Sequence, residues 1–359
     1  MRVLDPLLER FALQSAAADL MPGERVGWCL RRVGFDPGTR KSYHDVRVMH
    51  SPKFKCAHYK NLIRCGSVWM CAVCGAKITE RRRVELSEAI ESFSGKVALA
   101  TFTAQHSRED LLKPLLSDFL TAWRWMLRHR TYDQIKGDYG ILGFVRSLET
   151  TYGGANGFHP HNHVLYFCNG DRCLDGLESA LTQLHIESLE HFSRSASWDR
   201  GCDVRTADSD VADYVTKFGR LPAAPKGWTV GHELTKSAVK LGHYGDHRTP
   251  AQLLWCYLWM NDRAAGAVWQ EIALTFKGRH QLTWSRGLRK LIDLGPEESD
   301  QVIVERDKED SVLLASLSLR QWQIILANDA RGEVLQASAS GDIGQLEDFL
   351  RTIGAYGIL

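Results

Sequence analysis

The feature that most constrains this fold is a run of three histidines at every second position in "GFHPHNHVLYF", residues 157–167. Successive side chains of a β-strand point to opposite faces, so His159, His161 and His163 share one face. The apolar residues that follow are typical of a strand that packs within a sheet. We therefore expect a rigid strand that presents three imidazoles side by side.

The segment before the histidines supplies a candidate carboxylate. Residues 140–151 also have a strand-like composition, and "YGGAN" joins the two segments with Gly and Asn residues that favour a hairpin turn. Such a hairpin would place Glu149 beside the imidazoles. A mixed nitrogen and oxygen ligand set favours Mg²⁺ or Mn²⁺. The alternative is three histidines that bind nothing, which is disfavoured because neighbouring imidazoles repel when protonated.

Cysteines crowd together upstream of the histidines. Cys56, Cys65, Cys71 and Cys74 have the spacing C-x8-C-x5-C-x2-C, and "CAVCG" forms its tight end. Both sulfurs of a C-x-x-C turn can face one tetrahedral cation, so we expect a structural Zn²⁺ site, in which His58 could replace Cys56. A nucleobase deaminase site would need an H-x-E motif before the C-x-x-C, and none precedes Cys71.

A third pattern lies downstream, in "DVADYVTK". Asp210, Tyr214 and Lys217 stand at helical positions i, i+4 and i+7, and so share one face. A carboxylate one turn before a tyrosine can activate the phenol or a water, and a lysine can offset phosphate charge. Alone, the same three residues are ordinary on a solvated helical face. The histidine strand is what favours the functional interpretation.

Length and charge are consistent with a nucleic-acid partner. The formal net charge is only +2, but residues 291–359 contain 13 acidic and 5 basic residues, so the rest of the chain is basic. Lys and Arg provide most non-specific affinity for phosphates. No apolar run is long enough for a membrane span and no signal peptide is visible, so we expect a cytoplasmic protein.

Together these segments resemble the plasmid rolling-circle replication initiators, the Rep proteins of the HUH endonuclease superfamily. The resemblance rests on "HPHNHVL" at 159–165, "YVTK" at 214–217 and "CGSVWMCAVCGAKI" at 65–78. Weaker similarity is found in "FTAQHSREDL" at 102–111, "ELTKSAVKLG" at 233–242 and "LTWSRGL" at 282–288.

The resemblance implies an α+β fold with an HUH-type antiparallel sheet of about five strands and helices on one face. It further implies that His161 and His163 hold the catalytic metal, that Tyr214 is the nucleophile and that Asp210 activates water at termination. Glutamate is more familiar at the Asp210 position. Asn162 stands where a hydrophobic residue is expected, but its side chain faces away from the metal.

The implied activity is origin-specific nicking of one DNA strand through a 5′-phosphotyrosine, which leaves a 3′-hydroxyl primer. The implied partners are plasmid origin DNA, single-stranded at the nick, and a host replicative helicase. Aromatic and basic residues after residue 122 could contact single-stranded DNA, although such a pattern is also typical of a helix with one buried and one solvated face. These residues are Trp123, Arg124, Trp125, Arg128 and Arg130.

The chain is longer than one typical domain. We expect residues 1–50 without an assigned function, a zinc knuckle and a basic helix containing Arg81 to Arg83 at 51–94, a catalytic domain at 95–290 and an acidic helical region at 291–359. Two alternatives stay open. One is an HUH transposase or relaxase, although relaxases would have the tyrosine before the histidines. The other is a non-catalytic zinc-knuckle DNA-binding regulator.

Overall fold

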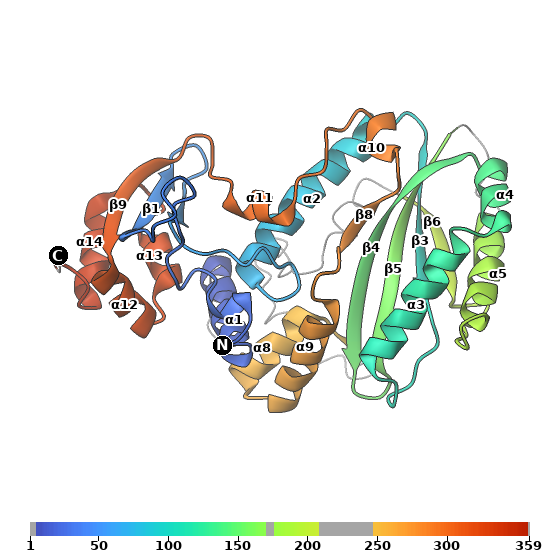
Figure 1. Ribbon diagram of the computed structural model, residues 1–359, viewed down its shortest axis with the longest axis horizontal. Helices are drawn as coiled ribbons and strands as arrows, with labels where there is room; N and C mark the ends of the chain where they lie inside the picture. The colour runs from blue at the N-terminus through green and yellow to red at the C-terminus, as the bar shows by residue number, and fades with distance from the viewer. Residues whose placement is uncertain (1–4, 170–175, 208–246, 358–359) are drawn as a thin grey trace. The chain divides into compact units, whose positions relative to one another are not determined.

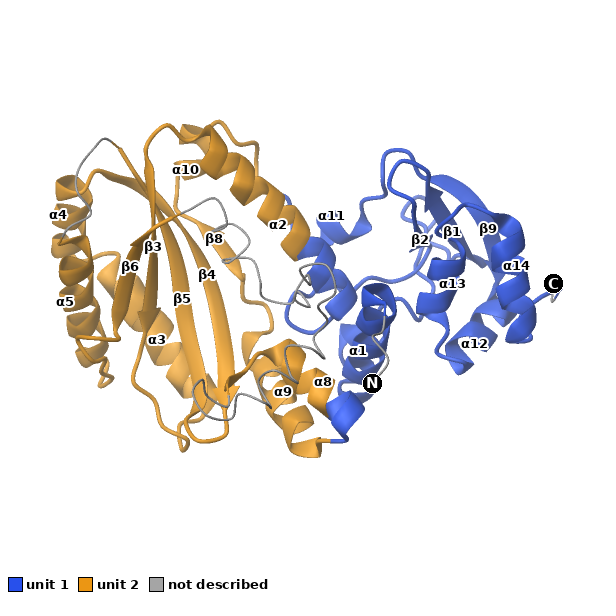
Figure 2. Ribbon diagram, turned by 180° about the vertical axis from the view of Figure 1, so that it is seen from behind, with its two compact units in different colours: residues 1–78, 257–261, 298–359 blue, residues 79–256, 262–297 orange. Residues whose placement is uncertain are grey.

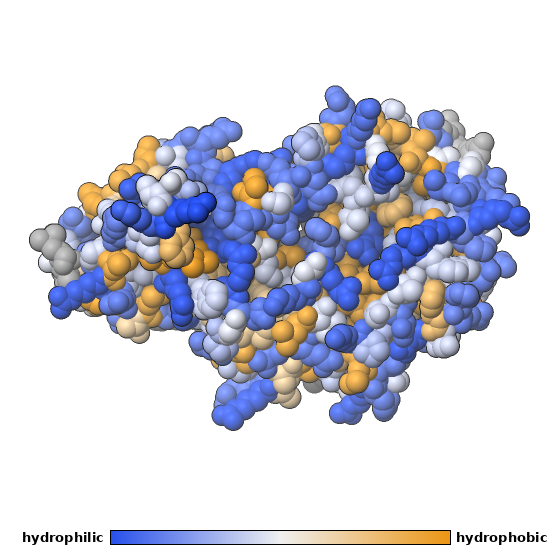
Figure 3. Space-filling view, viewed as in Figure 1, coloured by the Kyte–Doolittle hydropathy of each residue, from blue (hydrophilic) through white to orange (hydrophobic). Residues whose placement is uncertain are grey.

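The computed structural model describes residues 5–169, 176–207 and 247–357, and Tyr214, Asp210 and Lys217 lie outside these ranges. The chain divides into two compact units (Figure 2). Unit 1 comprises residues 1–78, 257–261 and 298–359, and unit 2 comprises residues 79–256 and 262–297. On the face seen in Figure 3, hydrophobic residues form small groups among hydrophilic ones.

Unit 1 is built around a three-stranded antiparallel sheet with the strand order β2-β1-β9. Its first and last parts, residues 1–50 and 291–359, both contribute strands to this sheet. The region expected to be an acidic helical tail is therefore not only helical. The strands are β1 (Asp45–Ser51), β2 (Cys56–Lys60) and β9 (Val312–Ser318).

Helices pack against this small sheet and bury Tyr59 of its edge strand β2. The ring of Tyr59 packs edge-on against Phe11 and Trp322, and its hydroxyl donates a hydrogen bond to the carbonyl of Arg331. The helices that lie wholly in unit 1 are α1 (Pro6–Leu20), η1 (Arg25–Gly27), α11 (Asp300–Glu305), α12 (Leu319–Ala327), α13 (Arg331–Ala337) and α14 (Ile343–Thr352).

Unit 2 contains a larger antiparallel sheet with the order β6-β3-β5-β4-β7, and β8 also pairs with β4 (Figure 1). This confirms the prediction of an α+β fold with an antiparallel sheet of about five strands. The strands are β3 (Lys96–Thr103), β4 (Ile141–Gly153), β5 (Gly157–Cys168), β6 (Cys202–Thr206), β7 (His247–Arg248) and β8 (Leu282–Trp284).

Helices cover both faces of this sheet, whereas the resemblance implied one. On one face, Trp123 of α3 packs against Phe102 and Phe144. On the other, Leu86 of α2 joins a buried cluster with Val145 and Leu165. The helices that contribute residues to unit 2 are α2 (Ala72–Ser92), α3 (Leu112–Met126), α4 (Arg130–Asp138), α5 (Leu177–Glu190), α8 (Pro250–Met260), α9 (Arg263–Phe276) and α10 (Leu288–Leu291).

The β4–β5 hairpin forms where the glycines of "YGGAN" predicted it. Gly153 pairs with Gly157 at the end of the ladder. Gly157 has a φ of 76°, and a Cβ there would lie 2.8 Å from the carbonyl oxygen of Ser107. Because both the backbone angle and the space favour glycine, this position fixes the hairpin and with it the register of the histidine strand.

Candidate metal centres

The hairpin brings Glu149, His161 and His163 together. Glu149 lies opposite His161 in the β4–β5 ladder, and its Oε2 is 3.6 Å from Nε2 of His161 and 3.8 Å from Nε2 of His163. Single ligand atoms from the three residues all lie within 4.8 Å of one another. Both imidazoles are buried, so two nitrogens and one carboxylate oxygen converge at a largely desolvated position.

The Nδ1 atoms of these two imidazoles lie within hydrogen-bond distance of oxygen atoms of the protein. Nδ1 of His161 is 3.0 Å from the carbonyl oxygen of His159, to which it can only donate. Nδ1 of His163 is 3.0 Å from Oγ1 of Thr101 on β3. An imidazole that donates through Nδ1 keeps a lone pair on Nε2, which is the arrangement that metal-binding histidines use.

His159 lies beside this group rather than within it. Its Nδ1 is 2.7 Å from Nε2 of His106, whose Nδ1 is 2.8 Å from the carbonyl oxygen of Asn156. Burial, together with the neighbouring imidazoles of His161 and His106, lowers the pKa of His159 to about 3. His159 is therefore a neutral neighbour of the group, and its predicted role as a direct ligand stays a prediction. Sequence reasoning missed His106, although the weakly similar segment "FTAQHSREDL" contains it.

The predicted tyrosine motif, Asp210, Tyr214 and Lys217, lies outside the described residues. The described chain stops at residue 207, directly after β6, and resumes at β7. Both strands belong to the sheet that carries Glu149 and the histidines, since β6 pairs with β3 and β7 pairs with β4. His247 of β7 has its ring centroid 6.3 Å from that of His159.

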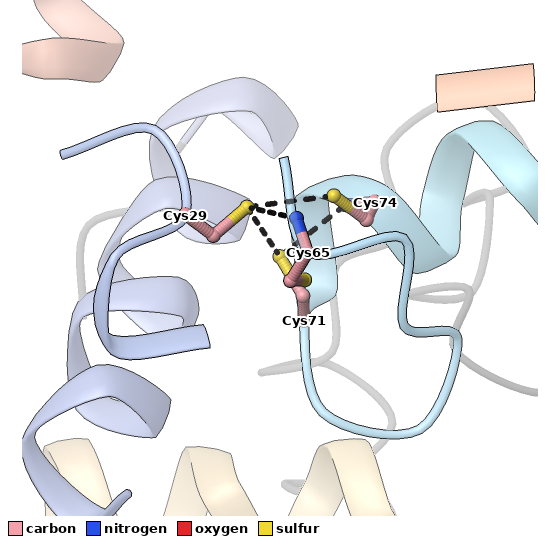
Figure 4. Close-up of side chains that lie close together, drawn as sticks. All are labelled: Cys29, Cys65, Cys71 and Cys74. Carbon is pink, nitrogen blue, oxygen red and sulfur yellow. Dashed lines mark hydrogen bonds between the residues drawn. The ribbon is translucent and has the colours of Figure 1, made fainter. Parts of the chain in front are cut away.

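A second group lies in unit 1 and consists of four buried cysteines (Figure 4). Three of them, Cys65, Cys71 and Cys74, are those predicted from the sequence. The fourth is Cys29, not Cys56. Cys56 lies on β2, paired with Ser51. The suggested substitute His58 is also engaged elsewhere, since its Nε2 is 3.2 Å from a carboxylate oxygen of Asp307.

The arginines predicted to make this segment a basic helix lie in the middle of α2 and pair with acidic side chains of the protein. Arg81 and Arg82 both contact the buried carboxylate of Glu85, and Arg83 contacts Glu80. These arginines therefore balance acidic neighbours on their own helix.

The tryptophans proposed to stack on DNA differ in their exposure. Trp123 is buried in the core of unit 2. Trp125 is partly exposed. Its ring stacks on the rings of His129 and His191, with centroid separations of 4.5 Å and 5.1 Å. Of the two, only Trp125 keeps an accessible edge.

The chain is similar to two curated Streptomyces proteins. It is 24% identical over 356 residues to "Protein rep" of Streptomyces lividans, across 78% of this chain and 76% of that protein. It is 30% identical over 219 residues to "Neomycin resistance protein" of Streptomyces cyanogenus, and this match spans 53% of this chain and half of that protein's length. No protein-family model matches the chain, and no solved structure matches it significantly. The similarity supports a Rep-like protein.

None of the helices in the described ranges combines the length and the hydropathy that crossing a bilayer would require.

Proposed function

We propose that this protein initiates plasmid rolling-circle replication by nicking one strand of its origin DNA. The observation that carries the proposal is the convergence of Glu149, His161 and His163 on one face of the sheet. The motif order and the similarity to a protein named Rep support the same function.

The donor set fits a divalent cation. Two imidazole nitrogens and one carboxylate oxygen already lie within 4.8 Å of one another, and the hydrogen bonds at Nδ1 leave Nε2 available on His161. This mixed set suits Mg²⁺ or Mn²⁺ better than a thiolate site would. When bound here, such an ion would act as a Lewis acid toward a phosphoryl oxygen.

The covalent step belongs to Tyr214. Its phenolate oxygen attacks the scissile phosphorus in line, a bond from that oxygen to phosphorus forms, and the bond from phosphorus to the 3′ oxygen breaks. The phenol proton leaves to solvent, and the departing 3′ oxygen gains one to become the primer hydroxyl. Lys217, whose spacing from Tyr214 in the sequence would place it on the same face of a helix, offsets phosphate charge, and Asp210 activates water at termination.

Two further features are proposed: the partners of the protein and a second metal ion. The partners are origin DNA, single-stranded at the nick, and a host replicative helicase that continues strand separation in the cytoplasm. The four-cysteine group holds a structural Zn²⁺, because thiolate ligands favour zinc and a closed four-ligand site leaves no position for chemistry.

A plasmid-nicking assay tests the proposal. The full chain is incubated with supercoiled plasmid that carries its own origin, with Mg²⁺ or Mn²⁺, and nicked circles with covalently attached protein are expected. A plasmid without the origin and a reaction with chelator are the controls. Origin binding without any nick under these conditions would favour the non-catalytic regulator instead.

A further inference from the structure

Cys29 completes the four-cysteine group, although it precedes Cys65 by 36 residues in the sequence. Its sulfur lies 3.5 Å from that of Cys74 and 3.8 Å from that of Cys71 (Figure 4). It also accepts a hydrogen bond from the backbone N–H of Cys65, at 3.3 Å. All four cysteines are buried and free.

We propose that Cys29 is the fourth ligand of a structural Zn²⁺ and that this ion fastens the N-terminal segment to the start of α2. Tetrahedral zinc with Zn–S bonds of about 2.3 Å places its sulfurs about 3.8 Å apart, which matches the observed spacing. Disulfide sulfurs are instead only about 2.05 Å apart. The backbone N–H of Cys74 donates to the sulfur of Cys71, a hydrogen bond that stabilises a thiolate.

The surroundings of Cys29 show what the ion would hold. Gln14 of α1 donates from its side chain to the carbonyls of Val26 and Cys29, at 3.1 Å and 3.0 Å. The next residue, Leu30, has a φ of 52° and donates its N–H to Ile63. A leucine in the left-handed region is strained, so neighbouring contacts must hold it there. The hydrogen bond to Ile63 is one such contact, and a metal ion on the adjacent Cys29 would provide another.

This arrangement gives the N-terminal segment a role that the sequence did not indicate. Helix α1 is tied to Cys29 through Gln14, and Cys71 and Cys74 lie at the start of α2. Metal binding would then be part of the folding free energy of unit 1. The inference does not depend on nicking, since it concerns only the four sulfurs and their neighbours.

Two matched variants test it. Cys29→Ser removes a cysteine inside the group, and Cys56→Ser removes one on β2 in the same unit. Metal content and zinc affinity of the full chain are measured by elemental analysis and competition with a chromogenic chelator. We expect one zinc per chain in the wild type and in Cys56→Ser, and at least about tenfold weaker binding in Cys29→Ser.

If Cys29→Ser does not fold, a second experiment is used, in which the wild type and Cys29→His are prepared with Co²⁺ in place of Zn²⁺. The wild type should give the charge-transfer absorption of four thiolates, and Cys29→His that of three. The proposal is overturned by wild-type protein without zinc, by iron in its place, by loss of zinc in Cys56→Ser alone, or by identical Co²⁺ spectra of wild type and Cys29→His.

A different observation, taken together with the proposed function, leads us to infer that Thr101 is a positioning residue for His163. The two lie opposite each other in the β3–β5 ladder, with Oγ1 of Thr101 3.0 Å from Nδ1 of His163. A metal ion at Nε2 requires the imidazole proton to be on Nδ1, and Oγ1 accepts it there. The hydroxyl would thus fix both the tautomer and the ring orientation.

Thr103 provides a close control. It lies two residues along the same strand, opposite His161, but its hydroxyl donates to the carbonyl of Arg200 rather than to an imidazole. We expect Thr101→Val to weaken Mn²⁺ binding about 10- to 100-fold, whereas Thr101→Ser and Thr103→Val stay near wild type. Binding is measured without DNA, by electron paramagnetic resonance of free Mn²⁺, on zinc-loaded protein.

These outcomes separate the inference from the proposed function. Weakened Mn²⁺ binding in Thr101→Val, in a protein that never nicks, would support the positioning role while rejecting the nickase. Equal affinity in Thr101→Val and wild type would overturn the positioning role, as would a wild type that binds no Mn²⁺.

Discussion

Glu149 and His161 lie directly opposite each other in the β4–β5 ladder, with Oε2 of the carboxylate 3.6 Å from Nε2 of the imidazole. This relationship depends on the strand register alone. A slip by one residue would move Glu149 to the opposite face of the sheet, away from both histidines. The hairpin turn between β4 and β5 is therefore as important to the candidate site as its side chains are.

Removing the charge of Glu149 should weaken the metal site. We expect Glu149→Gln to lower Mn²⁺ affinity at least about tenfold and to reduce nicking in parallel, because the amide is a poorer ligand than the carboxylate. Titration calorimetry and the plasmid assay measure the two effects. Glu187→Gln, at an exposed position on α5, is the control and should change neither. Unchanged affinity in Glu149→Gln would exclude this carboxylate as a ligand.

Tyr214→Phe should abolish nicking and leave origin binding within about twofold of wild type, because only the nucleophilic oxygen is lost. Gel-shift and denaturing gel assays on the same DNA distinguish the two activities. A covalent protein–DNA adduct that persists in this variant would show that another residue is the nucleophile.

Asp210→Ala should separate initiation from termination. The phenol proton of Tyr214 can leave to solvent, so measurable nicking is expected to remain. Hydrolysis at termination needs a water positioned to attack phosphorus, and Asp210, four residues before the tyrosine in the sequence, is the carboxylate that we propose for this role. Plasmids that depend on this variant should accumulate multimeric displaced strands. Equal loss of nicking and termination would instead make Asp210 the base for Tyr214 or a metal ligand.

Buried His185 should make the folded protein sensitive to acid. Its Nε2 donates to the carbonyl of Thr103 at 2.8 Å, and burial lowers its pKa to about 4. The unfolded chain, with a histidine pKa of about 6.5, binds the extra proton first. The stability from neutral His185 is therefore complete above pH 6.5 and is lost as the pH falls toward 4, by roughly 3 kcal/mol.

Urea unfolding at pH 7 and pH 4.5 measures this effect. His185→Gln keeps a donor for the carbonyl of Thr103 but cannot titrate, so its stability should fall less between the two pH values than that of the wild type. The same slope in both proteins would assign the acid sensitivity to other groups.

Leu165 tests the packing of α2 and α10 against the sheet. It is completely buried in the cluster with Leu86, Val145 and Leu288. Leu165→Ala should destabilise unit 2 by about 2–5 kcal/mol through lost apolar contact and a residual cavity. Leu142→Ala, at an exposed position on β4, should cost much less.

The sequence predicted those features that depend on local periodicity. β5 coincides with the predicted histidine strand to within one residue, and the turn before Gly157 follows from the need for a positive φ. Because side chains alternate on a strand, the grouping of His161, His163 and Glu149 follows from their spacing and from the hairpin between them. The tyrosine motif remains a prediction, since its residues are outside the described ranges.

Features that depend on tertiary packing were missed. Cys56 was preferred because it is near Cys65 in sequence, yet β2 pairing holds it in the small sheet while Cys29 reaches the group from after η1. A lone upstream cysteine was the only signal. Arg81 to Arg83 were likewise interpreted by type, although Glu85 follows Arg81 and Arg82 at helical spacing. Only packing shows that Glu85 is buried and that Arg289 also pairs with it.

The β1–β9 pairing determines when unit 1 can be completed during synthesis. Asp45 and Ser316, which share a hydrogen bond across this pair, are 271 positions apart in the chain. At roughly 5–20 residues per second, a ribosome needs roughly 15 to 50 seconds to make the intervening segment. During that interval β1 has an open edge, and Val46 and Val48 cannot yet be fully covered. The nascent chain is therefore most exposed to misassembly not at the β4–β5 hairpin, whose strands are adjacent in sequence, but at the small sheet that closes last.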